Sequence, residues 1–402
     1  MLRTRRSHIL TVLSLAALTA AAACDDPVQS GLDDVDVVPQ AVAQAQGASP
    51  LGEPFRVFSQ NIYLGADVSA VLSVDFNDIP AVVAGARQFW ADVEATDFRQ
   101  RARAIAADIA MTDPHVVGLQ EVAQYVRLGF NPQVPGGFAP TEVLDMAQIL
   151  MEELAYAEVD YVLMGIQENT TGRLPISGDF IPLPTGPIPA ELLQFTLGEA
   201  TLVRGDLAGA ASFVSDNYQA IVPLGALDLK RGWSMVTVPF RGTPHHVVNT
   251  HLEAWAPQVQ VAQAEELINS VTAGLDGVTI VLGDLNSDAT LRKGDPSWTP
   301  TYGMFRDAGF ADAWQKSTSH RGRGFTCCHD PDLRNDTPTL DQRIDFVLYR
   351  SDVPAPEGYA VPGPIHMTIL GDEVGEKTDG GLWPADHAAL FAGIYGATLL
   401  AR

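Results

Sequence analysis

From Phe55 onward, short runs of apolar or alternating residues are separated by segments with apolar residues three and four positions apart. The short runs predict β-strands and the other segments predict amphipathic helices. The clearest predicted strands are FRVFS, HVVGL, YVLMGI, EATLVR, WSMVTVPF, HHVVNTHL, VTIVLGD, IDFVLY, IHMTIL and HAALFAGIYG. The predicted helices cover residues 97–111, 142–155 and about 257–273. This alternation predicts a layered α/β domain.

Composition divides the chain into three parts. Residues 25–53 contain five aspartates among Gln, Ala, Gly and Pro without periodicity, which predicts an acidic disordered tether over residues 24–53. Residues 172–190 contain five prolines and are predicted to form a long loop. We therefore expect one folded domain at residues 54–396, preceded by a signal peptide at residues 1–23.

The first 23 residues have the pattern of an export signal. Three arginines within the first six residues precede an apolar run at residues 9–23, which is short for a membrane span of about 20 residues. Small residues then lead into Cys24, as at a bacterial lipoprotein cleavage site, although Ala21 stands where that pattern prefers leucine. Lipidation of Cys24, ordinary cleavage and a retained anchor all stay open. We expect an extracytoplasmic protein, secreted or lipid-anchored at the bacterial cell envelope.

The composition allows a large core but limits the partners. The 402 residues are 46% hydrophobic and 18% charged, with a net charge of −24. Such an acidic surface disfavours non-specific sliding on nucleic acid, which depends on many Lys and Arg contacts to phosphates. A nuclease is not excluded, because a metal ion and a few local arginines can hold one phosphate. No segment indicates an obligate protein partner, and we expect a monomer.

Six short polar segments lie at the ends of apolar runs, and five of them follow or adjoin a predicted strand. They are Gln60-Asn61, Gln120-Glu121, Asn249-Thr250-His251, Gly283-Asp284-Leu285-Asn286, Arg343-Ile344-Asp345 and Asp386-His387. Strand ends that meet at one edge of a sheet can assemble a site from residues far apart in the chain. The set contains acids, amides and imidazoles but no serine or cysteine nucleophile. It suits a hard divalent cation and a histidine base, and so predicts metal-assisted phosphoester hydrolysis.

Each candidate also has a structural interpretation. Asp284 and Asn286, two residues apart, can point the same way from a strand end, or they can form an Asx turn. Glu121 can bind a metal or simply be solvated, and Asn61 can serve a turn. A lone histidine such as His251 is often structural.

Asp345 is the least expected of these residues, because a carboxylate in a buried strand needs a partner. It forms an ion pair with Arg343, or it orients a catalytic imidazole as carboxylates do in hydrolytic triads. The adjacent pair Asp386-His387, which precedes an apolar strand, offers such an imidazole.

In their order, the six segments resemble the endonuclease/exonuclease/phosphatase superfamily, which includes pancreatic-type deoxyribonuclease and neutral sphingomyelinases. The resemblance covers about residues 54–396. It implies an α/β fold, a four-layer sandwich of two mixed β-sheets flanked by helices, with the site at one edge. It also implies a phosphoester substrate and Mg²⁺ as the cofactor, with Mn²⁺ able to replace it.

The resemblance further implies residue roles. The metal would be held by Glu121, Asn61 and Asp386. The implied catalytic residues are His387, Asp345, Asp284, Asn286 and His251. Among these, His387 would be the acid/base histidine held by Asp345, and His251 would contact phosphoryl oxygens. The implied phosphate contacts are Arg231 and, less well matched, Arg204 and Tyr161. Ala385 stands where the family usually has serine, which removes a hydroxyl from the rim of the site.

The segment at residues 320–343 combines adjacent cysteines with basic residues. In an oxidising compartment Cys327 and Cys328 can form a vicinal disulfide. Two free thiols are an alternative, and so is zinc bound together with His329 and Asp330, although four consecutive ligands cannot easily surround one ion. The arginines of this segment are Arg321, Arg323 and Arg334. We expect Arg321 and Arg323 to contact an anionic substrate.

Three functions remain open on this basis. The first is a phosphodiesterase acting on a lipid or small phosphodiester, and the second is a secreted endonuclease acting on DNA. The acidic surface and the predicted anchor favour the first. The third is a catalytically silent surface binding protein on the same scaffold, which the completeness of the candidate site disfavours.

Overall fold

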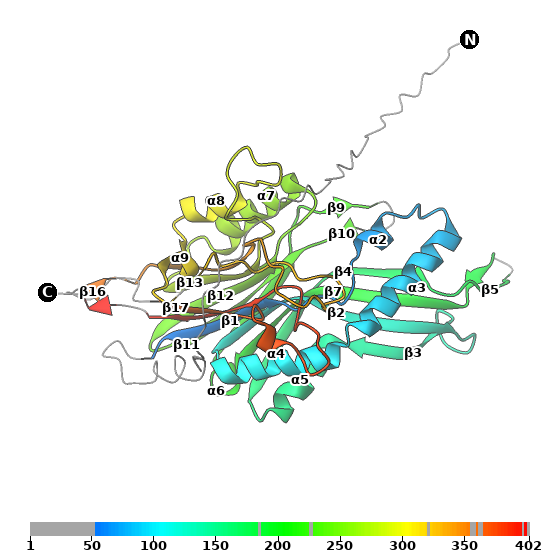
Figure 1. Ribbon diagram of the computed structural model, residues 1–402, viewed down its shortest axis with the longest axis horizontal. Coiled ribbons are helices and arrows are strands. Elements are labelled where there is room, and N and C mark those ends of the chain that lie inside the picture. The colour runs from blue at the N-terminus through cyan, green and yellow to red at the C-terminus, as the bar shows by residue number, and fades with distance from the viewer. Residues whose placement is uncertain are drawn as a thin grey trace, which may run out of the picture. The chain divides into compact units, whose positions relative to one another are not determined.

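The computed structural model describes residues 53–399 apart from 184–185, 225–227, 320–321, 354–358, 361–364 and 396–397. The predicted signal peptide, almost all of the tether, Cys24 and Arg321 lie outside the described residues. Two large mixed sheets form the centre of the folded part (Figure 1). This architecture agrees with the predicted fold class.

The first sheet is built from segments distant in sequence. Its strands are β1 (Phe55–Asn61), β2 (Val116–Phe130), β3 (Phe138–Asp145), β4 (Tyr161–Pro175), β7 (Glu191–Arg204), β17 (Ile365–Leu370) and β18 (Ala389–Ile394). They are ordered β17-β18-β1-β2-β7-β4, and β3 pairs with β2. Only β1 and β2 run parallel; the other pairs are antiparallel.

The second sheet repeats this arrangement. Its strands are β8 (Ser212–Asn217), β11 (Gly232–Phe240), β12 (Thr243–His251), β13 (Val278–Asp284), β14 (Ala311–Asp312) and β15 (Asp345–Ser351). The order is β14-β15-β13-β12-β11-β8, with β12 and β13 parallel and the rest antiparallel. Each sheet therefore has one parallel pair whose carboxyl ends lie side by side.

Helices and short strands complete the fold. The helices are α2 (Ser69–Leu72), α3 (Ile79–Ala95), α4 (Phe98–Thr112), α5 (Met146–Tyr156), α6 (Gly205–Ala208), α7 (Pro257–Glu266), α8 (Thr301–Asp307) and α9 (Ala313–Lys316), with a π-helix η1 (Leu267–Val271) after α7 and a 3₁₀ turn η2 (Val374–Glu376). The short strands are β5 (Phe180–Ile181), β6 (Ile188–Pro189), β9 (Val222–Pro223), β10 (Asp228–Leu229), β16 (Tyr359–Ala360) and β19 (Thr398–Leu399). Among the described residues, no helix is long and apolar enough to cross a membrane.

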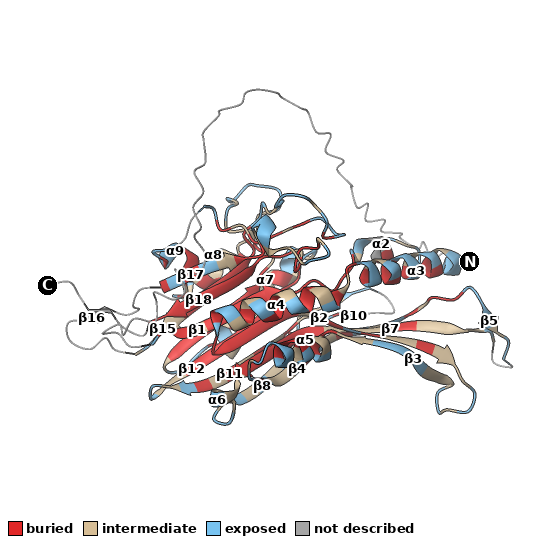
Figure 2. Ribbon diagram, turned by 60° about the horizontal axis from the view of Figure 1, so that its bottom comes forward, coloured by how far each residue is buried: buried red, intermediate tan, exposed pale blue. Residues whose placement is uncertain are grey.

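Apolar side chains pack in three layers between four layers of structure. Val57 of β1 and Ile280 of β13 belong to the core between the two sheets. Ile105 of α4 lies in the core that joins α3, α4 and α5 to the outer face of the first sheet. Phe305 of α8 lies in the core under α7 and α8 on the second sheet. Figure 2 shows this burial along the central strands and the inward helix faces.

Two predicted elements differ from the structure. The helix predicted at residues 142–155 begins only at Met146, because the side chain of Asp145 accepts a hydrogen bond from Gln148 N and caps it there. The preceding residues pair with β2 as strand β3. The loop predicted at residues 172–190 is partly strand, since β4 continues to Pro175 and β5 pairs with β6. Proline is tolerated in such edge and terminal positions.

Candidate active site

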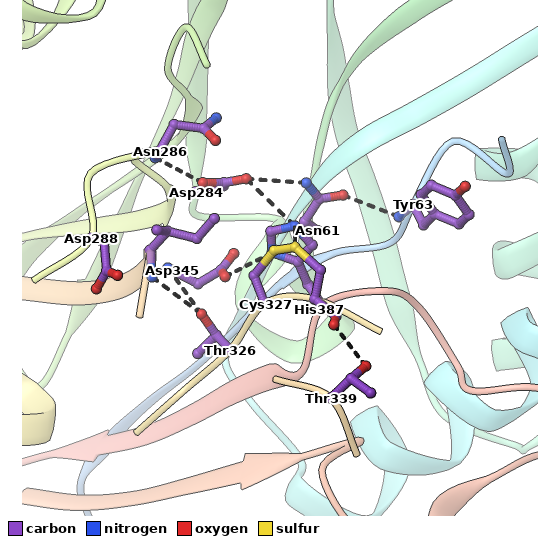
Figure 3. Close-up of a disulfide and its surroundings, with 12 residues drawn as sticks. Asn61, Tyr63, Asp284, Asn286, Asp288, Thr326, Cys327, Thr339, Asp345 and His387 are labelled. Atoms are coloured by element: carbon purple, nitrogen blue, oxygen red, sulfur yellow. Dashed lines mark hydrogen bonds and ion pairs between the residues drawn. A yellow bond between two sulfur atoms is a disulfide. The ribbon is translucent and has the colours of Figure 1, made fainter. Parts of the chain in front are cut away.

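The two parallel strand pairs bring most of the predicted residues to one edge of the sheets. Asn61 ends β1 and pairs in register with Gln120 of β2. His251 ends β12 opposite Asp284, which ends β13. Asp345 begins the antiparallel strand β15 and lies opposite Asp284. The same end of each sheet therefore supplies the site (Figure 3).

A β-bulge turns Glu121 toward β1. The register of β2 against β7 shifts between Leu119 and Val122, and Glu121 adopts a left-handed φ of 56°. Its Oε1 accepts a hydrogen bond from Asn61 Nδ2 at 3.1 Å, and its Oε2 accepts from Leu64 N at 3.0 Å. A regular strand would direct this side chain elsewhere, so the bulge positions it for the site.

The glycine before Asp284 is required by close backbone packing. Gly283 has φ 130°, and any side chain there would collide with the carbonyl oxygen of Thr250. Asp284 Oδ1 then accepts from Asn286 N at 2.8 Å, as in an Asx turn. The other oxygen, Oδ2, accepts from Asn61 Nδ2 at 3.2 Å. The turn and the site are thus compatible interpretations of Asp284 and Asn286.

Asp345 pairs with His387 and not with Arg343. The distance from Asp345 Oδ2 to His387 Nδ1 is 2.8 Å, and both residues are buried. Arg343 instead donates to Asp312 Oδ2 at 2.9 Å, so the ion pair considered as an alternative is wrong. Burial alone would lower the pKa of His387, but the charges of Asp345 and Asp386 outweigh it and raise this pKa well above its usual range. The imidazole is therefore held protonated.

His251 has the opposite electrostatic character. Arg231 Nη1 lies 3.0 Å from its Nδ1, and its Nε2 lies 3.3 Å from Asp284 Oδ2. Burial, together with the positive charges of Arg231 and His387, lowers its pKa well below the usual value. Since an arginine only donates, Nδ1 is the acceptor of the neutral imidazole. The nearest neighbour of Nε2 is Asn286 Nδ2 at 3.0 Å. His251 is therefore a neutral imidazole.

The carboxylates of the site lack enough cationic partners. Burial raises the pKa of Asp284 to about 7, and the nearby charge of Asp345 adds to this effect. Burial also raises the pKa of Asp386 to about 7, with Glu121 as a further contributor. Among the described residues, neither Asp345 Oδ1 nor Asp386 Oδ1 has a hydrogen-bond partner. An unpartnered set of oxygen donors fits a hard divalent cation.

Two groups of side chains could hold that cation. Asn61 and Glu121 are hydrogen-bonded to each other, and Asp386 is close enough to Glu121 for their charges to interact. Asp284, Asp345 and His387 also have potential ligand atoms within 4.8 Å of one another. Because His387 Nδ1 is occupied by Asp345, the oxygen-rich first group fits a metal better.

Several predicted residues have other positions. Arg204 lies at the opposite end of β7, where it binds Asp113 and Asp206, and Tyr161 donates there to Pro114 O. Neither reaches the site, because residues 116–120 of β2 lie between that end of the strand and Glu121. Arg323 is exposed and its guanidinium lies 5.7 Å from the centre of the Phe325 ring. Its predicted contact with substrate remains a prediction.

Two of the polar segments serve the scaffold as well. Gln120 Nε2 donates to Asn249 Oδ1 at 2.6 Å, and Asn249 Nδ2 donates to Leu119 O and Ala200 O. These buried bonds join the first sheet to the second directly behind the site. They satisfy polar groups that would otherwise be costly to bury.

The structure adds residues that the sequence patterns did not single out. Glu199 of β7 and Asn169 of β4 line the same cavity as Glu121, and Asn169 Nδ2 donates to both Glu199 oxygens at 2.7 and 2.8 Å. Burial raises the pKa of Glu199 to about 8. Glu199 is the first residue of the predicted strand EATLVR, and only the full extent of β7 (Glu191–Arg204) places this acid inside a strand.

Cys327 and Cys328 form a disulfide beside the catalytic histidine (Figure 3). Cys328 Sγ lies 4.0 Å from His387 Nε2, and Cys327 forms an isolated β-bridge with His387. His329 instead stacks on Trp383 and contacts Gly371 O. The four consecutive residues therefore do not converge on one ion.

A model of the Endonuclease/Exonuclease/phosphatase family matches residues 61–387. A search of curated proteins found no match. Among solved structures, the chain is similar to an endonuclease/exonuclease/phosphatase family protein from Leptotrichia buccalis, with 13% identity and a TM-score of 0.49, covering 85% of this chain and 99% of the other.

Two further solved structures are similar at the same level. Truncated TDP2 from Caenorhabditis elegans is 17% identical with a TM-score of 0.45, covering 85% of this chain and 97% of the other. A mannosyl-6-phosphatase from Bacteroides thetaiotaomicron is 15% identical with a TM-score of 0.46, covering 85% and 99%.

Proposed function

The chain belongs to the endonuclease/exonuclease/phosphatase family and is a metal-dependent phosphoester hydrolase, and we propose that it is a Mg²⁺-dependent phosphodiesterase. One observation carries the proposal. Asp284 Oδ2 lies 3.2 Å from Asn61 Nδ2, 3.3 Å from His251 Nε2 and 3.9 Å from His387 Nε2, so that acid, amide and imidazole groups meet at one carboxylate oxygen.

Asp284 is suited to hold an attacking water molecule by a hydrogen bond and to accept a proton from it. Its pKa of about 7, raised by burial and by Asp345, is near neutrality, where a general base is most effective. Asn286 is fixed beside it by the hydrogen bond from its backbone to Asp284 Oδ1. This pair would therefore orient the water against phosphorus.

The histidines divide the remaining work. His251, kept neutral beside Arg231, can donate to a phosphoryl oxygen without itself adding charge. His387, kept protonated by Asp345, can stabilise negative charge that develops in the transition state and supply a proton. Asp345 is thus a positioning residue for His387.

Asn61, Glu121 and Asp386 would hold the metal. A divalent cation at these oxygens would neutralise phosphate charge as a Lewis acid. We propose Mg²⁺, with Mn²⁺ as a substitute, because the donors are carboxylate and amide oxygens and not thiolates. The apolar N-terminal run and Cys24 support an exported enzyme, secreted or lipid-anchored, and we propose that it acts as a monomer.

The test is hydrolysis of bis-(p-nitrophenyl) phosphate by the purified enzyme. Mg²⁺ or Mn²⁺ should be required, EDTA should abolish turnover, and a zinc-selective chelator should leave it intact. The test variant is Asp284→Asn, which keeps the side-chain shape but removes the carboxylate. Its kcat should fall by at least about three orders of magnitude. Full activity in EDTA, or an unimpaired Asp284→Asn variant, would refute the proposal.

A further inference from the structure

We propose that the substrate is a lipid phosphoester, bound with an alkyl or acyl chain in the cavity that opens beside the catalytic groups. This inference rests on the proposed phosphodiesterase function and names its substrate class. The cavity has a volume of about 360 Å³, and Glu121, His251, Asp284 and His387 line its polar end. A phosphate in contact with these groups would leave the rest of the cavity for one substituent.

The walls of that remaining space are apolar. One wall comes from the segment after β1 and from α2 and α3, and the other from β4 and β7, which run beneath α2 and α3 in the view of Figure 1. The residues that form these walls are Leu64, Val71, Phe89, Leu174, Phe195 and Leu197. Leu64 directly contacts the site through its backbone hydrogen bond to Glu121, so the apolar space begins at the metal-binding group.

Large apolar side chains also surround the mouth. Phe76, Leu224 and Trp255 line the cavity and are 47%, 37% and 54% exposed. They come from the loop after α2, the loop after β9 and the segment after β12. Scattered exposed apolar residues are ordinary, but a group around the mouth of a cavity marks a surface for an apolar ligand.

Charge disfavours a polynucleotide in this cavity. Of the described Lys and Arg side chains, only Lys230 and Arg231 line it, and Arg231 already contacts His251 Nδ1 at 3.0 Å and Glu253 at 3.6 Å. Glu121, Glu199 and Asp284 face the same space. Successive phosphates of a nucleic acid would lack the cations they require. A lipid phosphoester presents one phosphate and one apolar chain, which matches both ends of the cavity.

The reaction consumes one water molecule for each ester bond. The water oxygen forms the new bond to phosphorus, one P–O ester bond breaks, and the leaving alkoxide takes a proton to become an alcohol. The other product is a phosphomonoester that keeps its second substituent. The apolar cavity contributes binding of the chain and takes no part in proton transfer.

The test compares methyl, butyl and octyl p-nitrophenyl phosphate, which share one leaving group and differ only in chain length. With Mg²⁺, and below the concentration at which the octyl ester aggregates, kcat/KM should rise at least tenfold from methyl to octyl, because each buried methylene favours binding. A flat series in an active enzyme would overturn the lipid assignment and leave the phosphodiesterase function intact. No hydrolysis of any ester would instead reject the proposed function.

A substitution in the cavity wall and a matched control substitution outside it test whether the preference for long chains arises in the cavity. In Phe195→Ser the octyl-to-methyl ratio of kcat/KM should fall at least fivefold, whereas Val214→Ser, an exposed apolar position on β8 outside the cavity, should keep the native ratio. Thermal melts establish that both variants fold, and the native chain-length series is decisive if Phe195→Ser does not. An unchanged ratio in folded Phe195→Ser, or faster cleavage of single-stranded or plasmid DNA than of the octyl ester, would overturn the proposal.

Discussion

Two acidic clusters lie along the central strands, and they differ in whether their carboxylates have arginine partners. At the amino end of β1 and β2, the clustered acids have arginine partners. Arg56 contacts Glu53 at 2.7 Å and Asp113 at 2.6 Å, while Arg204 contacts Asp113 at 2.7 Å and Asp206 at 2.8 Å. These partly exposed pairs complete the end of the sheet and contribute modestly to stability.

At the carboxyl end of β1 and beside the bulge in β2, carboxylates outnumber the Lys and Arg side chains. Glu121, Asp284, Asp345 and Asp386 gather there, and Arg231 is held by His251 and Glu253. Burial raises the pKa of both Asp284 and Asp386 to about 7, whereas the Arg204 guanidinium lowers the pKa of Asp206 at the opposite end. The excess of buried acid is therefore unfavourable in the free protein, and a divalent cation would relieve it.

The largest expected effect is on kcat, and it should distinguish an acid of the site from an acid of the arginine-paired cluster. Glu121→Gln should lower kcat by at least about three orders of magnitude, because it removes charge from the metal group while keeping the side-chain shape. Glu53→Gln, the matched change at the paired end, should leave kcat unchanged. Steady-state hydrolysis of bis-(p-nitrophenyl) phosphate at saturating Mg²⁺ measures both. Equal losses in the two variants would contradict the functional contrast between the ends.

Asp345→Asn should lower kcat by roughly two orders of magnitude and leave the fold nearly intact. The amide can keep the contact with His387 Nδ1, but it no longer supplies the charge that raises the pKa of the imidazole. The acid-side limb of the pH–rate profile and the thermal melting temperature should be recorded together. A variant that melts early yet keeps its specific activity would show that Asp345 is only structural.

A matched pair of arginines gives a smaller contrast. Arg231→Met should lower kcat/KM by about tenfold to a hundredfold, since it removes the donor at His251 Nδ1. Arg204→Met should keep kcat/KM and lose at most about 1 kcal/mol of unfolding free energy, because its partners are exposed. Kinetics and urea unfolding distinguish the two. Impaired catalysis in a folded Arg204→Met variant would show that Arg204 contributes to the active site.

The smallest expected effect is on stability and depends on pH. The folded-state pKa of Asp386, about 7, lies above its ordinary value of 3.8, so the folded protein binds this proton more tightly than the unfolded chain does. Its contribution to stability is fully present below about pH 4 and is lost as pH rises toward 7. Asp386→Asn should therefore gain stability over the native chain across that window, on the order of 1 kcal/mol without metal.

Mg²⁺ should reverse this difference above pH 7. The cation stabilises the native carboxylate form by mass action, and the uncharged amide of the Asp386→Asn variant would bind it more weakly. Urea unfolding of both chains from pH 4 to 8, with Mg²⁺ and with EDTA, measures the effect. A native chain that is more stable than Asp386→Asn in EDTA at pH 7 would contradict the unpaired state of this acid.

Local sequence signals were sufficient for those parts of the site that depend on neighbours in the chain. The Gly283-Asp284-Leu285-Asn286 turn follows a buried strand, and its Asx geometry needs only residues within that turn. The buried carboxylate of Asp345 likewise needs a partner, and the sequence offered two, Arg343 or a catalytic imidazole. The predicted fold class is confirmed because strand and helix periodicities report which faces are buried.

The sequence pattern could not show, by contrast, which strand residues lie at the site. Arg204 and Arg231 both adjoin apolar strands, yet one lies at the paired end and the other beside His251. The pairing register decides this, and register depends on contacts between strands that are distant in sequence. The same holds for Glu121, which reaches Asn61 only through a bulge in β2.

The sequence alone determined the chemical inventory, the order of the site residues and the layered α/β fold, because these follow from residue type and local periodicity. Tertiary structure alone decided which acids lack arginine partners, which polar residues join the two sheets, and that an apolar cavity opens beside Glu121 and His251. The physical reason is that burial and electrostatic pairing are properties of the packed chain, in which Asp345 meets His387 across 42 residues and Asn61 meets Asp284 across 223.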